Sequence, residues 1–186
     1  LVMEDSSAED DALTLNDLFK RLKKEDAFVV AHVGGRYADV SYAHDAKLEP
    51  SVEVHSAWGT FEWIFEEALQ AGYRVGIVAG SDDHKGRPGS SYPGASKFGS
   101  YGGLTCHLLP ELNRDSLFKA FRQRRHYATT GCRAYIDLRL KSLGNAIREE
   151  GNDLIEVTEA LIGDIIKSDS ESVTFDLKVA GHCGIE

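Results

Sequence analysis

The stretch Ile77–His84 reads Ile-Val-Ala-Gly-Ser-Asp-Asp-His, an apolar run that ends in a charged segment. A short apolar run followed by glycine is typical of a parallel strand that is buried on both faces. Because alternate residues of an extended chain point the same way, Asp82 and His84 are expected to project together from the carboxyl end of this strand. A carboxylate and an imidazole placed in this way suit a divalent metal ion. The alternative is a turn in which these polar residues only satisfy backbone N–H groups, and the motif alone leaves both interpretations open.

The composition indicates a chain with a real core and an acidic surface. The sequence has 186 residues, enough for one substantial domain, and 42% of them are hydrophobic. The formal net charge of −9 argues against a nucleic-acid-binding face, because phosphate binding favours clustered positive charge. No apolar run approaches the roughly 20 residues that cross a bilayer. We therefore expect neither a nucleic-acid partner nor a membrane span.

The three cysteines predict no disulfide framework and no thiolate zinc site. Cys106, Cys132 and Cys183 are an odd number and have no Cys-x-x-Cys spacing. Isolated cysteines of this kind usually behave as small buried hydrophobic residues.

Both ends of the sequence suggest a piece of a longer protein. The first residue is Leu1 rather than methionine, and Val173–Glu186 alternates like a strand and then stops. No signal peptide is visible, because Leu1 to Met3 runs straight into acidic and polar residues. In a piece of a longer protein this observation leaves the cellular compartment open.

Periodicity predicts alternating helices and strands over the first two thirds of the chain. Leucines recur at helical spacing after Thr14, which is a suitable N-cap. Thr60 and Gly72 bracket a second apolar stripe as its expected N-cap and C′ residue. Such alternation implies parallel strands with right-handed crossovers. The expected helices are 13–24, 61–71 and 114–125, and the expected strands are 27–31, 52–55, 73–80 and 104–109.

The segment 81–102 is rich in Gly, Ser and Pro and has no periodicity. A loop of this length inside a compact domain is usually functional or mobile. Because it directly follows the metal-like motif, an active-site lid is one hypothesis, and a mobile insertion is the other.

The pattern changes after Gly131. Residues 134–140 and 173–179 alternate between apolar and polar, which is typical of half-buried antiparallel strands. We therefore predict an α/β unit over residues 1–131, followed by the start of a small β-sandwich domain over residues 132–186.

Three successive predicted strands end in side chains that bind metals. They end in His32, in Glu53-x-His55 and in Asp82-x-His84. Neighbouring parallel strands lie about 4.8 Å apart, so residues at their ends can converge on one or two ions. A single histidine at a strand end is more often structural, but three such ends in register predict a metal site.

Two of these motifs carry a resemblance to a known family. Gly80–His84 resembles the last metal motif, G-S-D-x-H, of the PHP (polymerase and histidinol phosphatase) superfamily, and Ala31-His32 resembles its earlier A-H motif. The chain also resembles an uncharacterised PHP-related family of larger proteins. In that family G-S-D-D-H is followed by a Pro/Gly loop, a G-G-L-T strand, a helix and R-R-x-Y-A-T-T-G. Gly102–Thr105 and Arg124–Gly131 match these later motifs, and the likeness covers about residues 27–140.

The resemblance implies an α/β fold, the C-terminal part of a distorted (β/α)7 barrel, with a metal site that hydrolyses phosphoesters. A small-molecule phosphoester is the implied substrate, and zinc, manganese or iron is the implied cofactor. Glu53 is either a further ligand or a residue that orients His55. The family's H-x-H motif and its next His motif are absent here, and we expect them, with full activity, in an upstream segment. The implied metal ligands are His32, His55, Asp82 and His84.

Other polar residues near these motifs have weaker interpretations. Arg36 and Lys85 are placed to contact a substrate phosphate, but solvated surface charge is the more common explanation of such residues. His107 is expected in the core or behind the metal ligands rather than among them, and Asp83 is expected to point away from Asp82. The cations that close the third helix are explained by its dipole, and they are Arg122, Arg124 and Arg125.

The leading functional hypothesis is a metal-dependent hydrolase fragment of the phosphoesterase type that uses a metal-activated water. The alternative is a non-catalytic barrel with a β-sandwich that acts as a binding module. A Ser-His-Asp hydrolase built on Ser81, Asp82 and His84 ranks behind both, because the sequence has no G-x-S-x-G nucleophile elbow.

Overall fold

A computed structural model describes residues 12–33, 38–87, 90–95 and 97–181 of the chain. Of these residues, 31% lie in strands and 16% lie in helices. No helix in this part of the chain is long and apolar enough to cross a membrane. Arg36 and Cys183, which entered the sequence analysis, lie outside the described residues.

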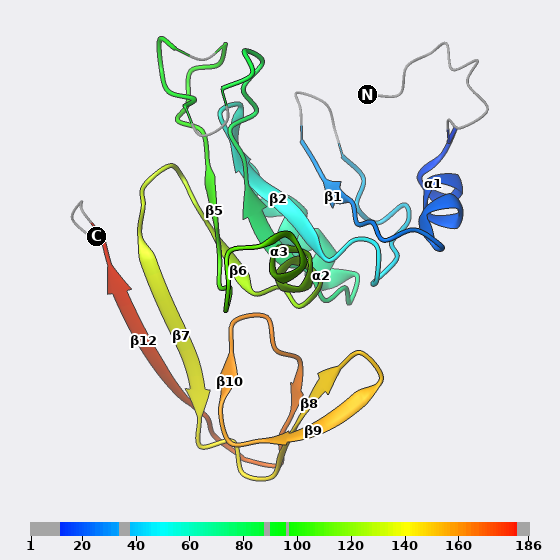
Figure 1. Cartoon of the computed structure of the whole chain (residues 1–186), viewed down its shortest axis with the longest axis vertical. Coiled ribbons are helices and arrows are strands. Elements are labelled where there is room, and N and C mark those ends of the chain that lie inside the picture. Colours follow the sequence, from blue (N-terminus) through cyan, green and yellow to red (C-terminus); the bar gives the residue numbers. More distant parts are fainter. Residues whose placement is uncertain (1–11, 34–37, 88–89, 96, 182–186) are drawn as a thin grey trace.

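A small parallel sheet forms the centre of the N-terminal half (Figure 1). Its middle strand pairs in parallel with a neighbour on each side, as the sequence predicted. The side chains of Val52 and Ile64 are fully buried between this sheet and the helix that follows its middle strand. The carboxyl ends of three parallel strands therefore meet at one edge. The elements are β1 (Val30–Ala31), β2 (Ser51–Ser56), β3 (Gly59–Thr60), α2 (Glu62–Gln70) and β4 (Gly76–Ala79).

The predicted helix caps are partly confirmed. The hydroxyl of Thr14 accepts a hydrogen bond from Asp17 N and caps helix α1 (Leu15–Leu22), as predicted. Gly72 follows α2 with a φ of 79°, a left-handed conformation that glycine adopts without strain. The N-cap prediction for Thr60 is wrong, because this residue belongs to β3 and α2 begins after Phe61 without a side-chain cap.

A two-stranded antiparallel sheet continues beside β4. It consists of β5 (Leu104–His107) and β6 (His126–Thr129), which are joined through α3 (Arg114–Arg122). The hydroxyl of Thr105 donates to Ala79 O at 2.8 Å and accepts from Ala79 N at 2.9 Å. The Thr105 side chain thus bonds to both the N–H and the carbonyl group of Ala79, the last residue of β4.

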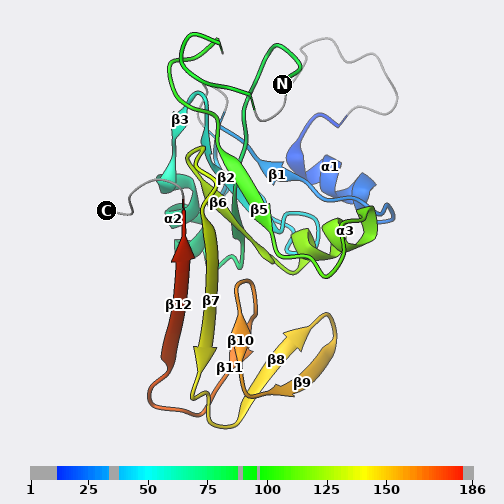
Figure 2. The ribbon, with the colours of Figure 1, turned by 60° about the vertical axis from the view of Figure 1, so that its left-hand side comes forward.

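The C-terminal part contains the two antiparallel strands that the alternating pattern predicted. They pair with each other along their whole length and form a long ribbon at one side of the molecule (Figure 2). Phe175 and Leu177 are 64% and 58% exposed on one face of this ribbon, whereas Asp176 and Lys178 lie on the other. The described strands form two small sheets rather than a continuous sandwich. They are β7 (Tyr135–Lys141), β8 (Ala146–Glu150), β9 (Asp153–Val157), β10 (Ala160–Leu161), β11 (Ile166–Lys167) and β12 (Thr174–Ala180).

The prediction of an α/β barrel fragment is wrong. The structure is mainly β, with several small sheets and three short helices among the described residues. A (β/α) barrel needs a helix after each of a series of parallel strands. Here the connection from β1 to β2 contains no helix in its described residues, and β5 and β6 are antiparallel. The division at residue 132 and the lid role of segment 81–102 stay predictions.

Candidate metal centre

A histidine and a glutamate from neighbouring strands meet at the carboxyl edge of the parallel sheet. His32 directly follows β1, and its Nδ1 makes a short contact with Glu53 Oε2 on β2. The same carboxylate reaches the residue after β4, because a Cβ atom built on Gly80 would lie 2.7 Å from Glu53 Oε1. The Glu53 side chain therefore lies close to the ends of both neighbouring strands.

The imidazole rings of His32 and His84 are held in the same manner. Each ring uses Nδ1 for an oxygen atom, which is Glu53 Oε2 for His32 and Asp82 O, at 2.9 Å, for His84. Carboxylates and carbonyls only accept hydrogen bonds, so Nδ1 carries the proton and Nε2 keeps its lone pair. Both side chains are about half exposed, at 47% and 51%. This is the arrangement in which a second ring nitrogen is available to a metal ion.

Asp82 does not have the extended backbone that the sequence analysis assumed. Its φ is 44°, a left-handed conformation that aspartate tolerates better than most residues. The carboxylate nevertheless stays beside His84, with 3.6 Å between Asp82 Oδ1 and His84 Nδ1. The two side chains predicted to act together are therefore neighbours, through a turn rather than through an extended strand end.

Asp83 has the structural role that the turn interpretation assigned to this motif. Its carboxylate accepts hydrogen bonds from Lys85 N at 3.0 Å and from Arg87 N at 2.8 Å. The turn interpretation therefore describes Asp83, whereas Asp82 lies beside His84 and its role as a metal ligand stays a prediction.

His55 is packed differently from the other histidines of the predicted set. It is buried, and its Nε2 lies 3.0 Å from Tyr101 O while its Nδ1 lies 2.8 Å from Thr60 Oγ1. The Tyr101 carbonyl requires a proton on Nε2, so Nδ1 accepts from the threonine hydroxyl. Both ring nitrogens are engaged within the protein. Glu53 does not orient His55, because both ring nitrogens of His55 have other partners and the Glu53 carboxylate contacts His32 instead.

The donor set fits a divalent ion in its chemistry but is not assembled around one point. Imidazole nitrogen and carboxylate oxygen are ligands for zinc, manganese and iron. Within the described residues, however, no three His, Cys, Asp or Glu side chains lie close enough to hold one ion. The ligand roles of His32, His55, Asp82 and His84 stay predictions.

Sequence reasoning did not identify a second His–Glu pair, which lies just before β2 rather than at the carboxyl edge of the sheet. His44 Nδ1 lies 2.8 Å from Glu49 Oε2, and its ring stacks on Tyr73 at 4.0 Å. Burial raises the pKa of the Glu49 carboxyl, and the hydrogen bond from His44 opposes this effect. The five-residue separation of a histidine and a glutamate was the only signal in the sequence, and it is too common to identify such a pair.

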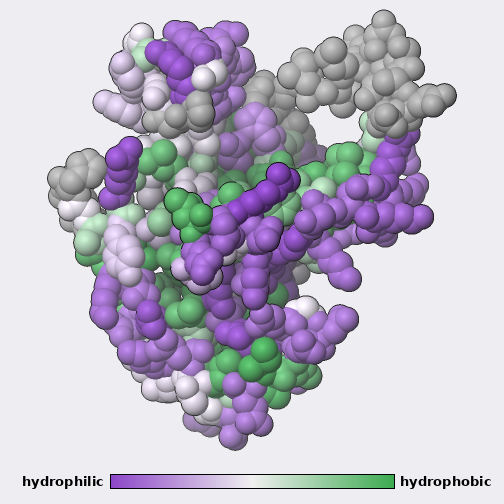
Figure 3. Space-filling model, in the orientation of Figure 1, coloured by the Kyte–Doolittle hydropathy of each residue, from purple (hydrophilic) through white to green (hydrophobic). Residues whose placement is uncertain are grey.

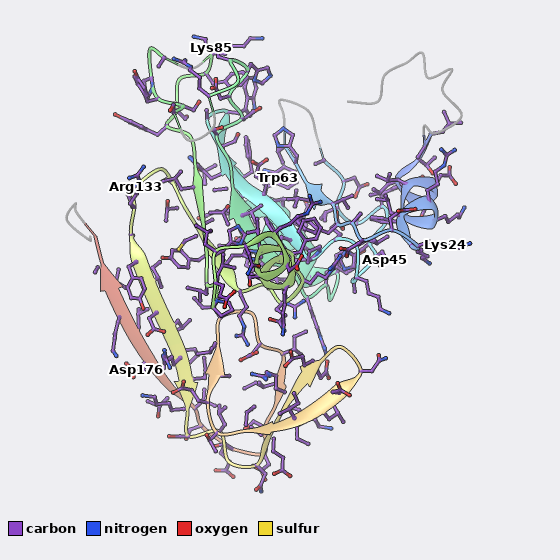
Figure 4. All side chains as sticks on the ribbon, in the orientation of Figure 1. Lys24, Asp45, Trp63, Lys85, Arg133 and Asp176 are labelled. Atoms are coloured by element: carbon purple, nitrogen blue, oxygen red, sulfur yellow. The ribbon has the colours of Figure 1, made fainter. Side chains whose placement is uncertain are left out.

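Two further residues that the sequence analysis considered, Lys85 and His107, have contacts within the protein. Lys85 Nζ donates to Ala95 O at 2.7 Å within its own loop, at the top of the view in Figure 4. His107 packs on Phe121 with 4.4 Å between ring centroids, as a core position predicts. Burial lowers the pKa of the His107 imidazole.

No protein-family model, no curated protein and no solved structure matches this sequence. The resemblance to the PHP superfamily is therefore not supported, and the mainly β architecture contradicts it. The barrel that this resemblance implied is withdrawn with it.

Proposed function

We propose that this chain is a metal-dependent hydrolase that binds a divalent ion, zinc, manganese or iron, at the carboxyl edge of β1, β2 and β4. The observation that carries the proposal is the orientation of two histidines. His32 and His84 each donate from Nδ1 to an oxygen atom and keep Nε2 for an ion, and Asp82 adds a carboxylate beside His84.

The protein's own residues would do most of the positioning. Glu53 holds the His32 ring, and the carbonyl of Asp82 holds the His84 ring. A bound divalent ion supplies a water of lowered pKa and a Lewis acid for a phosphoester oxygen. The end of the neighbouring loop contacts the edge through the hydrogen bond from Gly103 N to Gly80 O at 2.7 Å, and segment 81–102 would limit the access of water if it acts as a lid.

The first test is metal binding by the purified chain and by a matched pair of variants. Asp82→Asn removes the carboxylate but keeps the side-chain shape and tolerates the positive φ. Asp153→Asn, on an exposed position of β9, makes the same change in net charge far from the edge. Calorimetric titration with Zn²⁺ and Mn²⁺ should show affinity about a hundredfold weaker in Asp82→Asn, equivalent to about 2.7 kcal/mol, and unchanged in Asp153→Asn.

Hydrolysis is tested on p-nitrophenyl phosphate, a generic phosphomonoester, with and without EDTA. Activity that requires added metal and falls in Asp82→Asn would support the proposal. A chain that binds neither ion at micromolar concentration, or equal losses in the two variants, would rule out this metal site.

The second candidate is a non-catalytic binding module, and the exposed apolar face of the β7–β12 ribbon favours it. Phe175 and Leu177 present large apolar side chains to solvent there. Metal binding without any chelator-sensitive hydrolysis would favour this candidate over the enzyme.

A further inference from the structure

A cavity of about 480 Å³ lies at the opposite edge of the parallel sheet, on the side of the strands' amino ends. It is enclosed by the chain just before β2, by the turn that follows α3, by β8 and by the turn between β10 and β11. The β8–β9 hairpin lies in the lower part of Figure 1, while the loop that follows β4 lies at the top, and much of the face seen in this view is hydrophilic (Figure 3). The cavity is therefore separate from the candidate metal centre.

The walls of this cavity are fixed to one another. Arg125 donates to Ile162 O at 2.8 Å and to Asp164 Oδ1 at 2.6 Å. Gly163, with a φ of 88°, approaches the chain so closely that an added Cβ would lie 2.4 Å from Arg124 O. The turn between β10 and β11 thus packs directly on the backbone that follows α3.

Cations outnumber carboxylates around the cavity, although the whole chain has a net charge of −9. The carboxylates are already paired: Glu149 with Arg74 at 2.9 Å, Glu150 with Arg148 at 3.0 Å, and Asp164 with Arg125 at 2.6 Å. The lining cations are Lys47, Arg122, Arg124, Arg125 and Arg148, and the lining acids are Glu149, Glu150 and Asp164.

Three of the lining cations have unused charge or donors. Arg124 makes no ion pair within the described residues and donates only to the carbonyls of Arg122 and Gly163, both at 3.3 Å. Lys47 also has no acidic partner in that part of the chain. The Nε–H of Arg148 is buried without a hydrogen-bond partner, and the nearest carboxylate oxygen in its ion pair with Asp164 is 3.8 Å away.

The electrostatic environment of Arg124 agrees with this geometry. Burial, followed by the charges of Arg74 and Arg125, lowers the pKa of its guanidinium, and Asp164 only partly offsets them. An anion in the cavity would remove this repulsion and would also accept from the buried Arg148 Nε–H, which now lacks a partner.

We propose that this cavity binds a small phosphate-bearing anion, with Arg124, Lys47 and Arg148 as its cationic contacts. The planar fork of arginine matches phosphate oxygens, and the cavity has the volume of a small-molecule site. This site does not depend on metal binding at the other edge of the sheet. It also gives the motif Arg124–Gly131 a role beyond closing helix α3.

The probe for this proposal is inorganic pyrophosphate, titrated into the full chain by calorimetry at low ionic strength. Three variants that each remove one positive charge are compared: Arg124→Gln, Lys47→Gln and Arg133→Gln. Arg133 is exposed near the start of β7, away from the β8–β9 hairpin in Figure 4, and serves as the control. Lys47 is exposed, so its replacement keeps the test valid if Arg124→Gln unfolds the chain.

The unchanged chain is expected to bind pyrophosphate with a dissociation constant below about 1 mM. The dissociation constant should rise about tenfold in Arg124→Gln and in Lys47→Gln, and it should stay within about twofold of the original value in Arg133→Gln. Equal weakening in all three variants would mean that only overall charge matters and would overturn the proposal. Absence of binding by the unchanged chain up to about 10 mM pyrophosphate would overturn it as well.

Discussion

The N-terminal half contains two histidine–glutamate pairs that share their chemistry and differ in their surroundings. In both, Nδ1 of the histidine contacts Oε2 of the glutamate. The side chains of His32 and Glu53 are 47% and 13% exposed, whereas those of His44 and Glu49 are 9% and 3% exposed. The buried pair also stacks on Tyr73. Burial therefore separates a pair that can meet a ligand from one that stabilises the fold.

The largest expected effect comes from removing the histidine of the buried pair. His44→Ala would leave the Glu49 carboxylate buried without its partner and should lower the free energy of unfolding by about 3 kcal/mol. His32→Ala, the same change in the exposed pair, should cost less than about 1 kcal/mol. Urea denaturation measures both. An equal loss of unfolding free energy in the two variants would show that burial does not distinguish the two pairs.

A third histidine extends the comparison to burial without a carboxylate. His126 is 2% exposed, its Nε2 lies 2.9 Å from Ser51 Oγ, and burial together with His107 lowers its pKa from 6.5 to about 4. As the pH falls below 6.5, the unfolded chain takes up this proton before the folded chain does, so stability is lost between pH 6.5 and 4. Each pKa unit is worth about 1.4 kcal/mol, which gives a total loss of about 3 kcal/mol.

Denaturation curves at pH 7 and pH 4 check this prediction, with His126→Gln as the comparison. The loss attributed to His126 should disappear in the variant, whatever its stability at pH 7. The Glu49 carboxyl, whose pKa is raised, works in the opposite direction, because its contribution falls as the pH rises. If the free energy of unfolding of His126→Gln depends on pH as strongly as that of the unchanged chain, groups other than His126 cause the loss of stability in acid.

A smaller effect should distinguish the two glutamates. Glu53→Gln keeps the size of the side chain but weakens its hold on His32, and metal affinity should fall by about 10- to 100-fold. Glu49→Gln should leave metal affinity unchanged, because its partner is buried away from the sheet edge. Titration with Zn²⁺ measures the affinity of both variants. An equal loss of affinity in the two variants would contradict a specific role of Glu53 in metal binding.

The smallest expected effect is that of one methyl group at the end of β4. Gly80→Ala would place a Cβ 2.7 Å from Glu53 Oε1 and push the carboxylate away from its present position. Because the end of a side chain can move, we expect thermal stability to change little and Zn²⁺ affinity to fall by about tenfold. A large drop in melting temperature with unchanged affinity would show that the contact supports only packing.

Local patterns in the sequence were enough to predict several parts of the fold. The apolar runs ending at Ala31, His55 and Gly80 correctly indicated parallel strands with a common edge, because buried strands have a distinctive composition. The alternation in residues 134–140 and 173–179 correctly indicated a pair of antiparallel strands.

Other features depend on residues that are distant in the sequence, and local patterns do not encode them. The ring of His55 contacts Tyr101 O, 46 positions away, and Thr60, which was expected to cap α2, lies in β3 and contacts the same ring. The antiparallel pairing of β5 and β6 across α3 replaced the parallel strands that a barrel requires. The left-handed backbone of Asp82 likewise follows from the turn that it enters, which its residue type permits but does not specify.

The free edge of the β7–β12 ribbon has a consequence for how the protein behaves in concentrated solution. Within the described residues β12 pairs only with β7, so its outer row of backbone groups is open to another strand. The apolar side chains of Phe175 and Leu177 would strengthen such an addition. Asp176 and Lys178 place charges between these apolar residues, and such charges disfavour the fibre-like stacking of strands from different molecules. We therefore expect the solubility of the chain to fall if Asp176 and Lys178 are replaced by apolar residues, although its overall negative charge would be little changed.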